Sequence, residues 1–378
     1  MKPIQMVDLK GQYHAIKSAI DQAIEGVLES TAFINGPEVK AFANELAEYT
    51  GASRVIPCAN GTDALQIAMM ALGAKPGDEV LVPTFTYVAT AEVIALLGLK
   101  PVFVDVTPDT FMLDVVELPN KLSEKTVGIV PVHLFGQVAN MDEILNFAHN
   151  HGLWVIEDTA QAIGAEYQMA DGQMHQAGTM GDIGTTSFFP SKNLGCYGDG
   201  GAMLVNNPEL AEKCRIIANH GQRVKYHHDV IGCNSRLDSV QAAILRVKLP
   251  HLREYSARRQ TVASAYDAAF ENHPLVTIPA RMPNSTHVFH QYTLKLDLSI
   301  NREGLREKLQ EAGVPTMVYY PVPLHLQEAF RQPEVDEGAF PITELLCQQV
   351  LSLPIHTEMD EDQLEHIIDA LTQALGHG

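Results

Sequence analysis

The stretch Leu153-Trp154-Val155-Ile156-Glu157-Asp158-Thr159-Ala160-Gln161 combines a short apolar run with acidic and polar residues directly after it. Four consecutive apolar residues of this kind predict a strand that is buried on both faces. Such strands occur in mostly parallel sheets that helices cover on each side. The stretch therefore favours an α/β fold and places Asp158 at the carboxyl end of a strand.

The same pattern recurs from about residue 52 to 205. Helical patterns separate the apolar runs, as expected where crossover connections join parallel strands. We therefore predict an open, mostly parallel central sheet flanked by helices. Its further strands are Glu79-Val80-Leu81-Val82, Val102-Phe103-Val104 and Gly128-Ile129-Val130, with helices at 86–97 and 142–149.

The pattern changes after about residue 208. Residues up to about 270 are predominantly helical, and the long helical stretch from Ser235 to Arg259 contains Pro250, which should kink or break it. The alternating segment Gln291-Tyr292-Thr293-Leu294-Lys295-Leu296 then predicts a half-exposed strand. Helices are expected near 302–311 and at about 360–375.

These features divide the chain into a large α/β domain at 1–250 and a smaller α+β domain at 251–378. The large domain carries an N-terminal helical segment at 1–50, with helical patterns at about 12–29 and 37–49. We expect this segment to pack on the second domain.

The composition limits the partners. The chain has 378 residues, of which 26 are basic and 46 acidic, and its formal net charge is −20. A field of that sign repels polyanions, so neither nucleic acid nor an anionic membrane is expected as a partner. An anionic ligand would need positive groups concentrated locally. Since no signal peptide, membrane-spanning run, Cys-x-x-Cys or other metal-binding motif is visible, we expect a soluble, cytoplasmic protein without a metal site.

Three segments could carry chemistry. In Cys58-Ala59-Asn60-Gly61-Thr62-Asp63, Gly61 permits close approach of the backbone, and Thr62 lies at a helix start, where a phosphate is favoured. An ordinary helix cap is the alternative. Asp158 and Gln161 could point toward one ligand, and a carboxylate there could hold a pyridinium proton; a cap for the next turn is the alternative.

The third segment, Thr186-Ser187-Phe188-Phe189-Pro190-Ser191-Lys192-Asn193-Leu194-Gly195, ends a strand with a single lysine among small and turn-forming residues. A lysine that forms an imine needs an uncharged amine and hence a partly desolvated position. A surface-hairpin lysine is the alternative. A phosphate cradle, an acid at a strand end and a later lysine together match the requirements of pyridoxal phosphate.

These segments resemble the DegT/DnrJ/EryC1/StrS aminotransferases, which act on nucleotide-linked keto sugars. The resemblance spans about residues 5 to 356 and implies the aspartate-aminotransferase-like fold (pyridoxal phosphate fold type I). It also implies a homodimer with active sites shared across the interface. Further matching pieces are Phe33-Ile34-Asn35-Gly36-Pro37-Glu38-Val39, Phe85-Thr86-Tyr87-Val88-Ala89-Thr90, Pro131-Val132-His133-Leu134-Phe135-Gly136 and Asn234-Ser235-Arg236-Leu237-Asp238.

The resemblance also implies roles for individual residues. Lys192 would bind the cofactor covalently and move protons, and Asp158 would pair with the pyridine nitrogen. Gln161 would contact the ring on its hydroxyl side, and Tyr87 would stack on the ring. The cofactor phosphate would be bound by Gly61, Thr62 and Ser187, and by Asn234 of the partner subunit.

A local basic segment could supply the concentrated positive charge that an anionic ligand would need in this acidic chain. It is Gln222-Arg223-Val224-Lys225-Tyr226-His227-His228, with Arg236 shortly after it. Our hypothesis is that Arg236 and this loop help to hold the anionic sugar nucleotide; the alternative is a solvated basic loop. Tyr319, Tyr320 and His325 are further candidate substrate contacts, with packing as the alternative for Tyr320 and His325.

The predicted reaction is transfer of the amino group of L-glutamate to a keto sugar. The residues after Lys192 look most like members that aminate C3 of UDP-linked 3-keto sugars, including an N-acetylglucosaminuronic acid derivative for surface polysaccharide such as lipopolysaccharide. Tyr319 departs from the family pattern, in which this position is frequently histidine. The alternatives are a C3 or C4 aminotransferase for a dTDP-linked keto-deoxysugar, a sugar dehydratase that uses the same cofactor, and a catalytically silent regulator.

Overall fold

The computed structural model describes residues 2–332 and 335–376 and is built around a seven-stranded sheet. The strand order is β1-β9-β8-β5-β4-β2-β3, and all pairs are parallel except the two that β9 makes with β1 and β8. The mostly parallel sheet predicted from the sequence is therefore confirmed. The strands are β1 (Arg54–Cys58), β2 (Glu79–Pro83), β3 (Lys100–Val104), β4 (Thr126–Ile129), β5 (Trp154–Asp158), β8 (Ile183–Ser187) and β9 (Gly201–Val205).

Each face of this sheet is buried by its own apolar cluster. Because successive side chains of a strand point to opposite faces, Val80 and Val82 lie in one cluster and Leu81 lies in the other. The first cluster includes residues of α4, α5 and α8, and the second includes residues of α7. The helices of this part are α4 (Gly61–Ala71), α5 (Ala89–Leu96), α6 (Leu118–Lys121), α7 (Met141–His151) and α8 (Pro208–Ala218).

The helix predicted at 86–97 begins three residues later than expected. The helix α5 starts at Ala89, while Thr86 and Tyr87 remain in the turn that follows β2. Both residues line the cavity described below. These two side chains are therefore presented from a turn at the carboxyl end of a strand.

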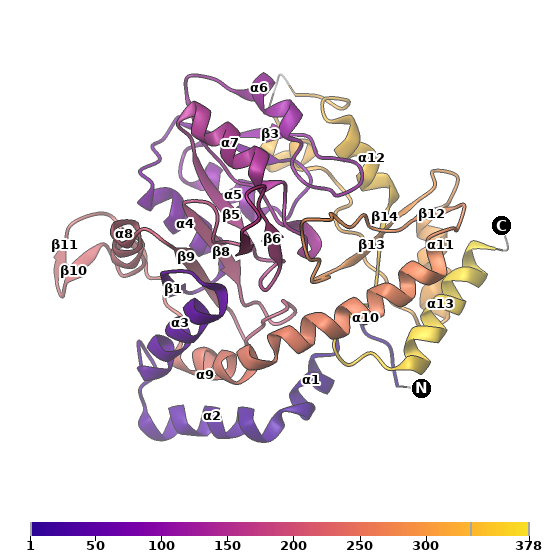
Figure 1. The fold of residues 1–378 in the computed structure, drawn as a ribbon, viewed down its shortest axis with the longest axis horizontal. Coiled ribbons are helices and arrows are strands. Elements are labelled where there is room, and N and C mark those ends of the chain that lie inside the picture. The colour runs from indigo at the N-terminus through magenta and orange to yellow at the C-terminus, as the bar shows by residue number, and fades with distance from the viewer. Residues whose placement is uncertain (1, 333–334, 377–378) are drawn as a thin grey trace.

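A second, antiparallel sheet forms in the C-terminal part, in the order β12-β13-β14, and Figure 1 shows it beside the long helix α10. The predicted break at Pro250 is confirmed, because it separates α9 from α10 through a short 3₁₀ turn, η3. The elements are α9 (Ser239–Lys248), η3 (Leu249–His251), α10 (Leu252–Phe270), β12 (Val276–Thr277), β13 (Tyr292–Leu296), α11 (Arg302–Glu311), η4 (Leu324–Leu326), η5 (Glu328–Phe330), α12 (Pro341–Gln349), β14 (Val350–Leu353) and α13 (Glu361–Leu375).

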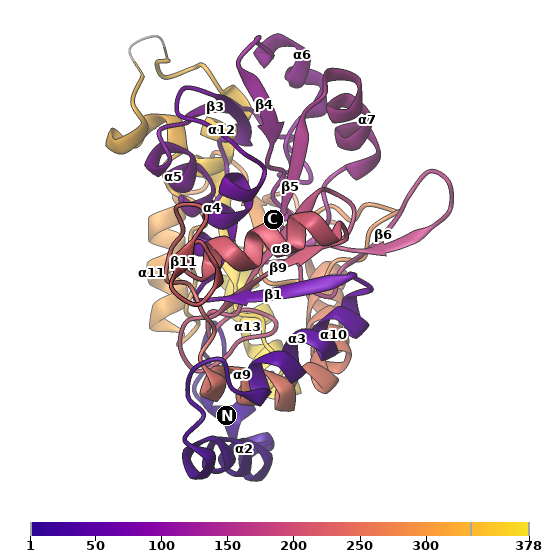
Figure 2. The same ribbon diagram turned by 90° about the vertical axis from the view of Figure 1, so that its left-hand side faces the viewer.

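The N-terminal helices lie elsewhere than predicted. The helices α1 (Leu9–Ala15), α2 (Lys17–Ser30) and α3 (Pro37–Thr50) follow the expected helical patterns. However, α2 and α3 pack on α9, and α3 also packs on β1, so the expectation that these two helices pack on the second domain is wrong (Figure 2). Ile4, which precedes the helices, does lie in the apolar cluster of the C-terminal part. Arg246 of α9 secures α3 by pairing with Glu38 at 2.6 Å and Glu45 at 2.7 Å.

The remaining elements are small. The hairpin of β10 and β11 projects from the body of the molecule next to α8, at the left of Figure 1. Within the described residues, no helix is both long and apolar enough to cross a membrane. The short elements are η1 (Val115–Glu117), η2 (Leu134–Gly136), β6 (Glu166–Gln168), β7 (Met174–Gln176), β10 (Gln222–Val224) and β11 (His227–His228).

Candidate active site

A cavity of about 810 Å³ opens at the carboxyl ends of β5 and β8, next to the first residues of α4. In open α/β sheets ligands bind at this edge, in the crevice outside the carboxyl ends of the strands. The cavity brings together most of the residues that the sequence singled out. The predicted site residues that line it are Gly61, Thr62, Tyr87, Asp158, Gln161, Ser187, Lys192, Tyr319 and Tyr320.

Lys192 lies in the turn after β8, where its backbone N–H donates to the carbonyl of Phe189 at 2.8 Å. Burial lowers the pKa of the Lys192 amine to about 8, and the negative charge of Asp158 acts in the opposite direction. At neutral pH, a much larger share of this amine is uncharged than in an ordinary lysine. An uncharged amine is the form that attacks a carbonyl carbon.

Asp158 is the last residue of β5, and two donors hold its carboxylate. The Thr90 hydroxyl donates to Oδ2 at 2.8 Å, and the Ala160 N–H donates to Oδ1 at 3.1 Å. The backbone of Asp158 is fixed as well, since its N–H donates to Pro131 and its carbonyl accepts from His133. The acid therefore faces the cavity in one defined orientation.

Gln161 is oriented by both ends of its amide. Its Oε1 accepts from the Phe135 N–H at 2.7 Å, and its Nε2 donates to the Tyr320 hydroxyl at 3.2 Å. The Tyr87 ring lies 6.4 Å from the Tyr320 ring and is 58% exposed, so its face is open to a planar ligand. The aromatic wall and the amide thus border the same cavity as Lys192.

The start of α4 has the geometry that suits an anion. Asn60 caps the helix by accepting from the Asp63 N–H at 2.8 Å. The N–H groups of Gly61 and Thr62 take no part in this cap. A Cβ on Gly61 would stand 2.8 Å from the Cβ of Ser187, so only glycine lets the helix start lie this close to β8. Free N–H groups at a helix N-terminus favour a phosphate.

Two buried hydroxyls in the cavity wall lack partners. The Oγ1 atoms of Thr86 and Thr186 have no hydrogen-bond partner among the described residues, and buried hydroxyls are rarely left this way. A low-pKa amine, an oriented carboxylate and a phosphate cradle with further free hydroxyls fit pyridoxal phosphate in both charge and chemistry. The geometry therefore agrees with the cofactor that the sequence predicted.

We expect covalent loading of this cofactor to depend on pH. Because only the uncharged Lys192 amine can attack the aldehyde, the initial rate of chromophore formation in the apo protein should rise with pH through about 8. Mixing apo protein with pyridoxal phosphate between about pH 6.5 and 9.5 measures this rate. A midpoint above about 10, typical of a solvated lysine, would contradict the expectation.

Two predicted residues lie away from this cavity. Arg236 lines a second cavity of about 480 Å³, together with Arg54 and Arg215. Asn234 forms an isolated bridge with Asn219 and does not line the main cavity of its own chain. The sequence predicts that Asn234 contacts the cofactor phosphate from the partner subunit. Its position outside the cavity of its own chain does not contradict that prediction.

His325 is buried inside the protein rather than at the cavity. Its Nδ1 lies 3.1 Å from the Thr84 hydroxyl, and its Nε2 lies 3.0 Å from the carboxylate of Glu344. Burial lowers the pKa of this histidine, and Glu344 acts in the opposite direction. His325 therefore links the residue after β2 to α12, which agrees with the packing alternative, and it does not line this cavity.

The predicted basic segment is exposed and partly paired. Arg223 lies 3.5 Å from Asp229 and 3.9 Å from Glu212. The Lys225 amine lies over the ring of the adjacent Tyr226. The loop therefore offers fewer free positive charges than its sequence suggests.

His290 is a titratable residue of the cavity that sequence reasoning did not single out. Its Nδ1 lies 3.3 Å from Oδ1 of Asn193, and burial, with the positive charges of Lys192 and Arg259, lowers its pKa well below the usual value. The only available signal was its position two residues before Tyr292, at the start of β13. A histidine at that place in a sequence does not reveal that the strand begins beside the cavity.

Comparison with known proteins is consistent with this geometry. The sequence model of the DegT/DnrJ/EryC1/StrS aminotransferase family matches residues 14–372. A UDP-2-acetamido-2-deoxy-3-oxo-D-glucuronate aminotransferase from Pseudomonas aeruginosa is 47% identical, over 98% of this chain and 99% of its own. A "pleiotropic regulatory protein" from Geobacillus stearothermophilus is 45% identical, over 99% of both chains.

Among solved structures, that of S. venezuelae DesV in complex with a ketimine intermediate superposes with a TM-score of 0.95. It is 37% identical in sequence, and the match covers 100% of both chains. The likeness therefore extends over the whole length of the chain, including the segments that line the cavity.

Proposed function

The chain belongs to the DegT/DnrJ/EryC1/StrS aminotransferase family of pyridoxal-phosphate-dependent enzymes, and from this premise we propose that it transfers the amino group of L-glutamate to C3 of a UDP-linked 3-keto hexose or hexuronate. The observation that carries this function is the cavity in which Lys192, Asp158 and the start of α4 meet. We place the reaction in the cytoplasm, as a step in the biosynthesis of surface polysaccharide such as lipopolysaccharide.

The residues divide the work between binding and proton transfer. When bound, pyridoxal phosphate supplies an electron-withdrawing ring that accepts electron density from the carbon next to the transferred amine. Lys192 binds the cofactor and carries a proton to and from that carbon, a task suited to an amine with a pKa of about 8. Asp158 holds a proton on the ring nitrogen, and Gly61, Thr62 and Ser187 bind the phosphate.

We propose a homodimer in which each subunit completes the other's site. Asn234 and Arg236 do not line the main cavity of their own chain, which agrees with a role in the partner's site. Large apolar side chains are exposed on the projecting hairpin, between the hairpin and Asn234, and at 33–34, where Ile34 forms a bridge with Asp238. Such a surface is expected where another subunit covers it. The exposed side chains are Phe33, Ile34, Val224, Tyr226, Val230 and Ile231.

Two observations support a UDP-linked 3-keto sugar as the acceptor. The relative from Pseudomonas aeruginosa is named for such a substrate and is 47% identical to this chain. The stretch from Phe188 to Ala202, which contains Lys192, also resembles this group of the family. Tyr319 lines the cavity where relatives frequently carry histidine, so it is placed to influence which sugar is accepted.

A panel of keto-sugar nucleotides tests this proposal. We expect glutamate to bleach the cofactor chromophore and a UDP-linked 3-keto sugar to restore it, with turnover at least about tenfold faster than for dTDP-linked sugars or 4-keto sugars. Product analysis by mass spectrometry and NMR locates the new amine. Preferred turnover of a dTDP-linked deoxysugar would replace the proposed substrate, and loss of a hydroxyl without amine transfer would identify a dehydratase.

A further inference from the structure

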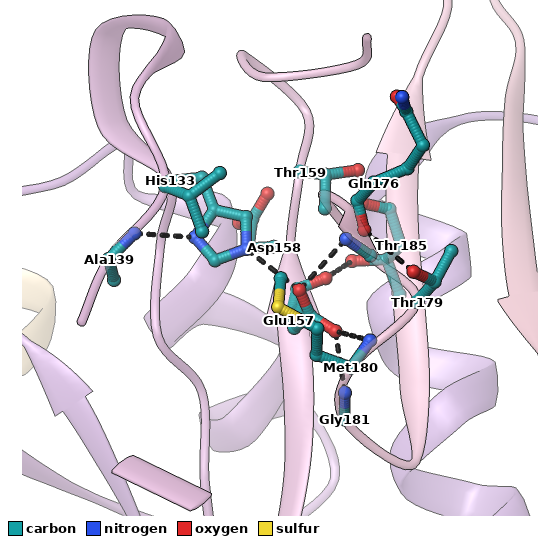
Figure 3. A network of polar contacts seen from close by, with 12 residues as sticks. His133, Ala139, Glu157, Asp158, Thr159, Gln176, Thr179, Met180, Gly181 and Thr185 are labelled. Carbon is teal, nitrogen blue, oxygen red and sulfur yellow. Dashed lines mark hydrogen bonds and ion pairs between the residues drawn. The ribbon is translucent and has the colours of Figure 1, made fainter. Parts of the chain in front are cut away.

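Glu157 and His133 form a hydrogen-bonded pair that is fully buried, and Figure 3 shows the polar contacts around it. The Nε2 atom of His133 lies 2.9 Å from Oε2 of Glu157, and Nδ1 accepts from the Ala139 N–H at 3.2 Å. Because Nδ1 acts as an acceptor, the ring proton is on Nε2, which donates to the carboxylate. Neither side chain lines the cavity, and no chemical step described above uses either of them.

Three backbone N–H groups complete the surroundings of Glu157. Its Oε1 accepts from Met180 at 2.7 Å and Gly181 at 2.6 Å, and its Oε2 accepts from Gly178 at 2.8 Å. Burial alone would raise the pKa of Glu157, but His133 and these N–H groups hold it below its usual value. The carboxylate is therefore a charged group with four donors and no contact with solvent.

This carboxylate joins three neighbouring segments of the sheet. His133 follows β4, Glu157 belongs to β5, and residues 178–181 form the turn before β8. The Thr185 hydroxyl donates to the Glu157 carbonyl at 3.2 Å, and the Thr159 hydroxyl donates to the Thr185 carbonyl at 2.8 Å. The side chain of Glu157 thus links β5, which ends in Asp158, to the turn before β8, the strand that precedes Lys192.

The turn at 178–181 has little freedom to move. Gly178 has φ +87°, and a Cβ there would stand 2.9 Å from Cγ2 of Thr159. A Cβ on Gly184 would collide with the carbonyl of Gly178. Glycine at both positions lets the turn press against the end of β5, where its N–H groups reach Glu157.

Asp158 is the next residue after Glu157, and the two side chains point to opposite faces of the sheet. We propose that Glu157 and His133 are positioning residues, which clamp β4, β5 and the turn before β8 so that the Asp158 carboxylate stays aligned with the cofactor's ring nitrogen. This inference rests on the proposed function, because Asp158 matters there only as the partner of that nitrogen. A small displacement of a catalytic group is sufficient to slow catalysis strongly.

The Glu157→Gln variant tests this inference. The amide has one acceptor oxygen and places an NH₂ group against N–H donors, so the clamp should loosen. We expect kcat to fall about tenfold to a hundredfold, with KM for glutamate changed less than about threefold. In addition, ¹⁵N NMR of ring-labelled cofactor should show the pyridine nitrogen losing its proton at a lower pH. In the apo protein, hydrogen exchange of residues 178–187 should be faster.

Two variants of His133 separate its two hydrogen bonds. A glutamine at this position can still donate to Glu157, whereas an asparagine reaches only far enough to accept from Ala139. We expect His133→Gln to keep kcat and the titration of the ring nitrogen within about threefold of the wild type. His133→Asn should behave like Glu157→Gln, and it decides the question if Glu157→Gln does not fold.

Asp105→Asn is the matched control. Asp105 is also a buried carboxylate with several donors, since it accepts from Ile342 at 3.0 Å and from Thr343 at 2.9 Å and 2.7 Å. It fixes α12 rather than β5, so its variant should melt at a lower temperature but keep the titration of the ring nitrogen. If Glu157→Gln and His133→Asn likewise lose only stability, the inference is wrong. If wild-type protein neither binds the cofactor nor transfers an amine, the proposed function fails instead.

Discussion

The Lys192→Ala variant is expected to lose amine transfer by about 10⁴-fold or more, since in the proposed function this one side chain both binds the cofactor and carries the proton. Alanine offers neither an amine for the aldehyde nor a base for the substrate carbon. The purified variant should also lack the chromophore of the covalently bound cofactor, although the phosphate cradle at α4 remains intact. Steady-state kinetics with glutamate and the keto sugar, together with absorption spectra, measure both effects.

Lys248→Met provides the matched control for this prediction. Burial also lowers the pKa of Lys248 to about 8, but its amine donates to the Gly195 carbonyl at 2.7 Å and does not line the cavity. We expect this variant to be less stable yet to bind the cofactor covalently. Normal turnover by Lys192→Ala, or loss of covalent binding in both variants to the same extent, would remove the role assigned to Lys192.

The Asp158→Asn variant is expected to keep covalent cofactor but lose about 10²- to 10³-fold in kcat. The neutral amide cannot balance a positive charge on the ring nitrogen, so the ring withdraws electrons less well. The amide also has only one acceptor for the two donors, Thr90 and Ala160, that now bind separate oxygens. Single-turnover bleaching of the chromophore by glutamate isolates this step from product release.

Thr90→Val separates charge from orientation at this site. The substitution removes the 2.8 Å hydrogen bond to Oδ2 and leaves the carboxylate charged. We expect a loss of no more than about tenfold, because the Ala160 N–H still holds Oδ1. An equal loss in Thr90→Val and Asp158→Asn would show that orientation alone, and not charge, is what Asp158 contributes.

The sequence was most informative where residues that are neighbours in the chain determine the local structure. The apolar runs at 79–82 and 153–156 became β2 and β5, because strands buried on both faces need continuous apolar residues. Asp158 and Lys192 lie at one cavity because Asp158 ends β5 and Lys192 follows β8, two strands of the same sheet. The helix at 302–311 also has the predicted bounds, and its Asn301 cap accepts from the Gly304 N–H.

The sequence was least informative about partners that are distant in the chain. Nothing near α3 indicated that Glu38 and Glu45 would pair with Arg246, some 200 residues later, so the packing of the N-terminal helices was predicted wrongly. The sequence left open whether His325 contacts substrate or serves packing, because only the fold brings Thr84 and Glu344 to its ring. Likewise, the free hydroxyls of Thr86 and Thr186 gain meaning only from the buried wall around them.

The cavity is built from two separate parts of the chain, and this bears on how new specificities can arise. The groups that line the cavity and are assigned to the cofactor lie at or just after the ends of strands of the large sheet, whereas Tyr319 and Tyr320 come from a loop about 130 residues after Lys192, beyond β13. Substitutions in that loop can reshape the far wall while the reacting groups keep their geometry. A lineage can therefore explore different sugars without first giving up its chemistry.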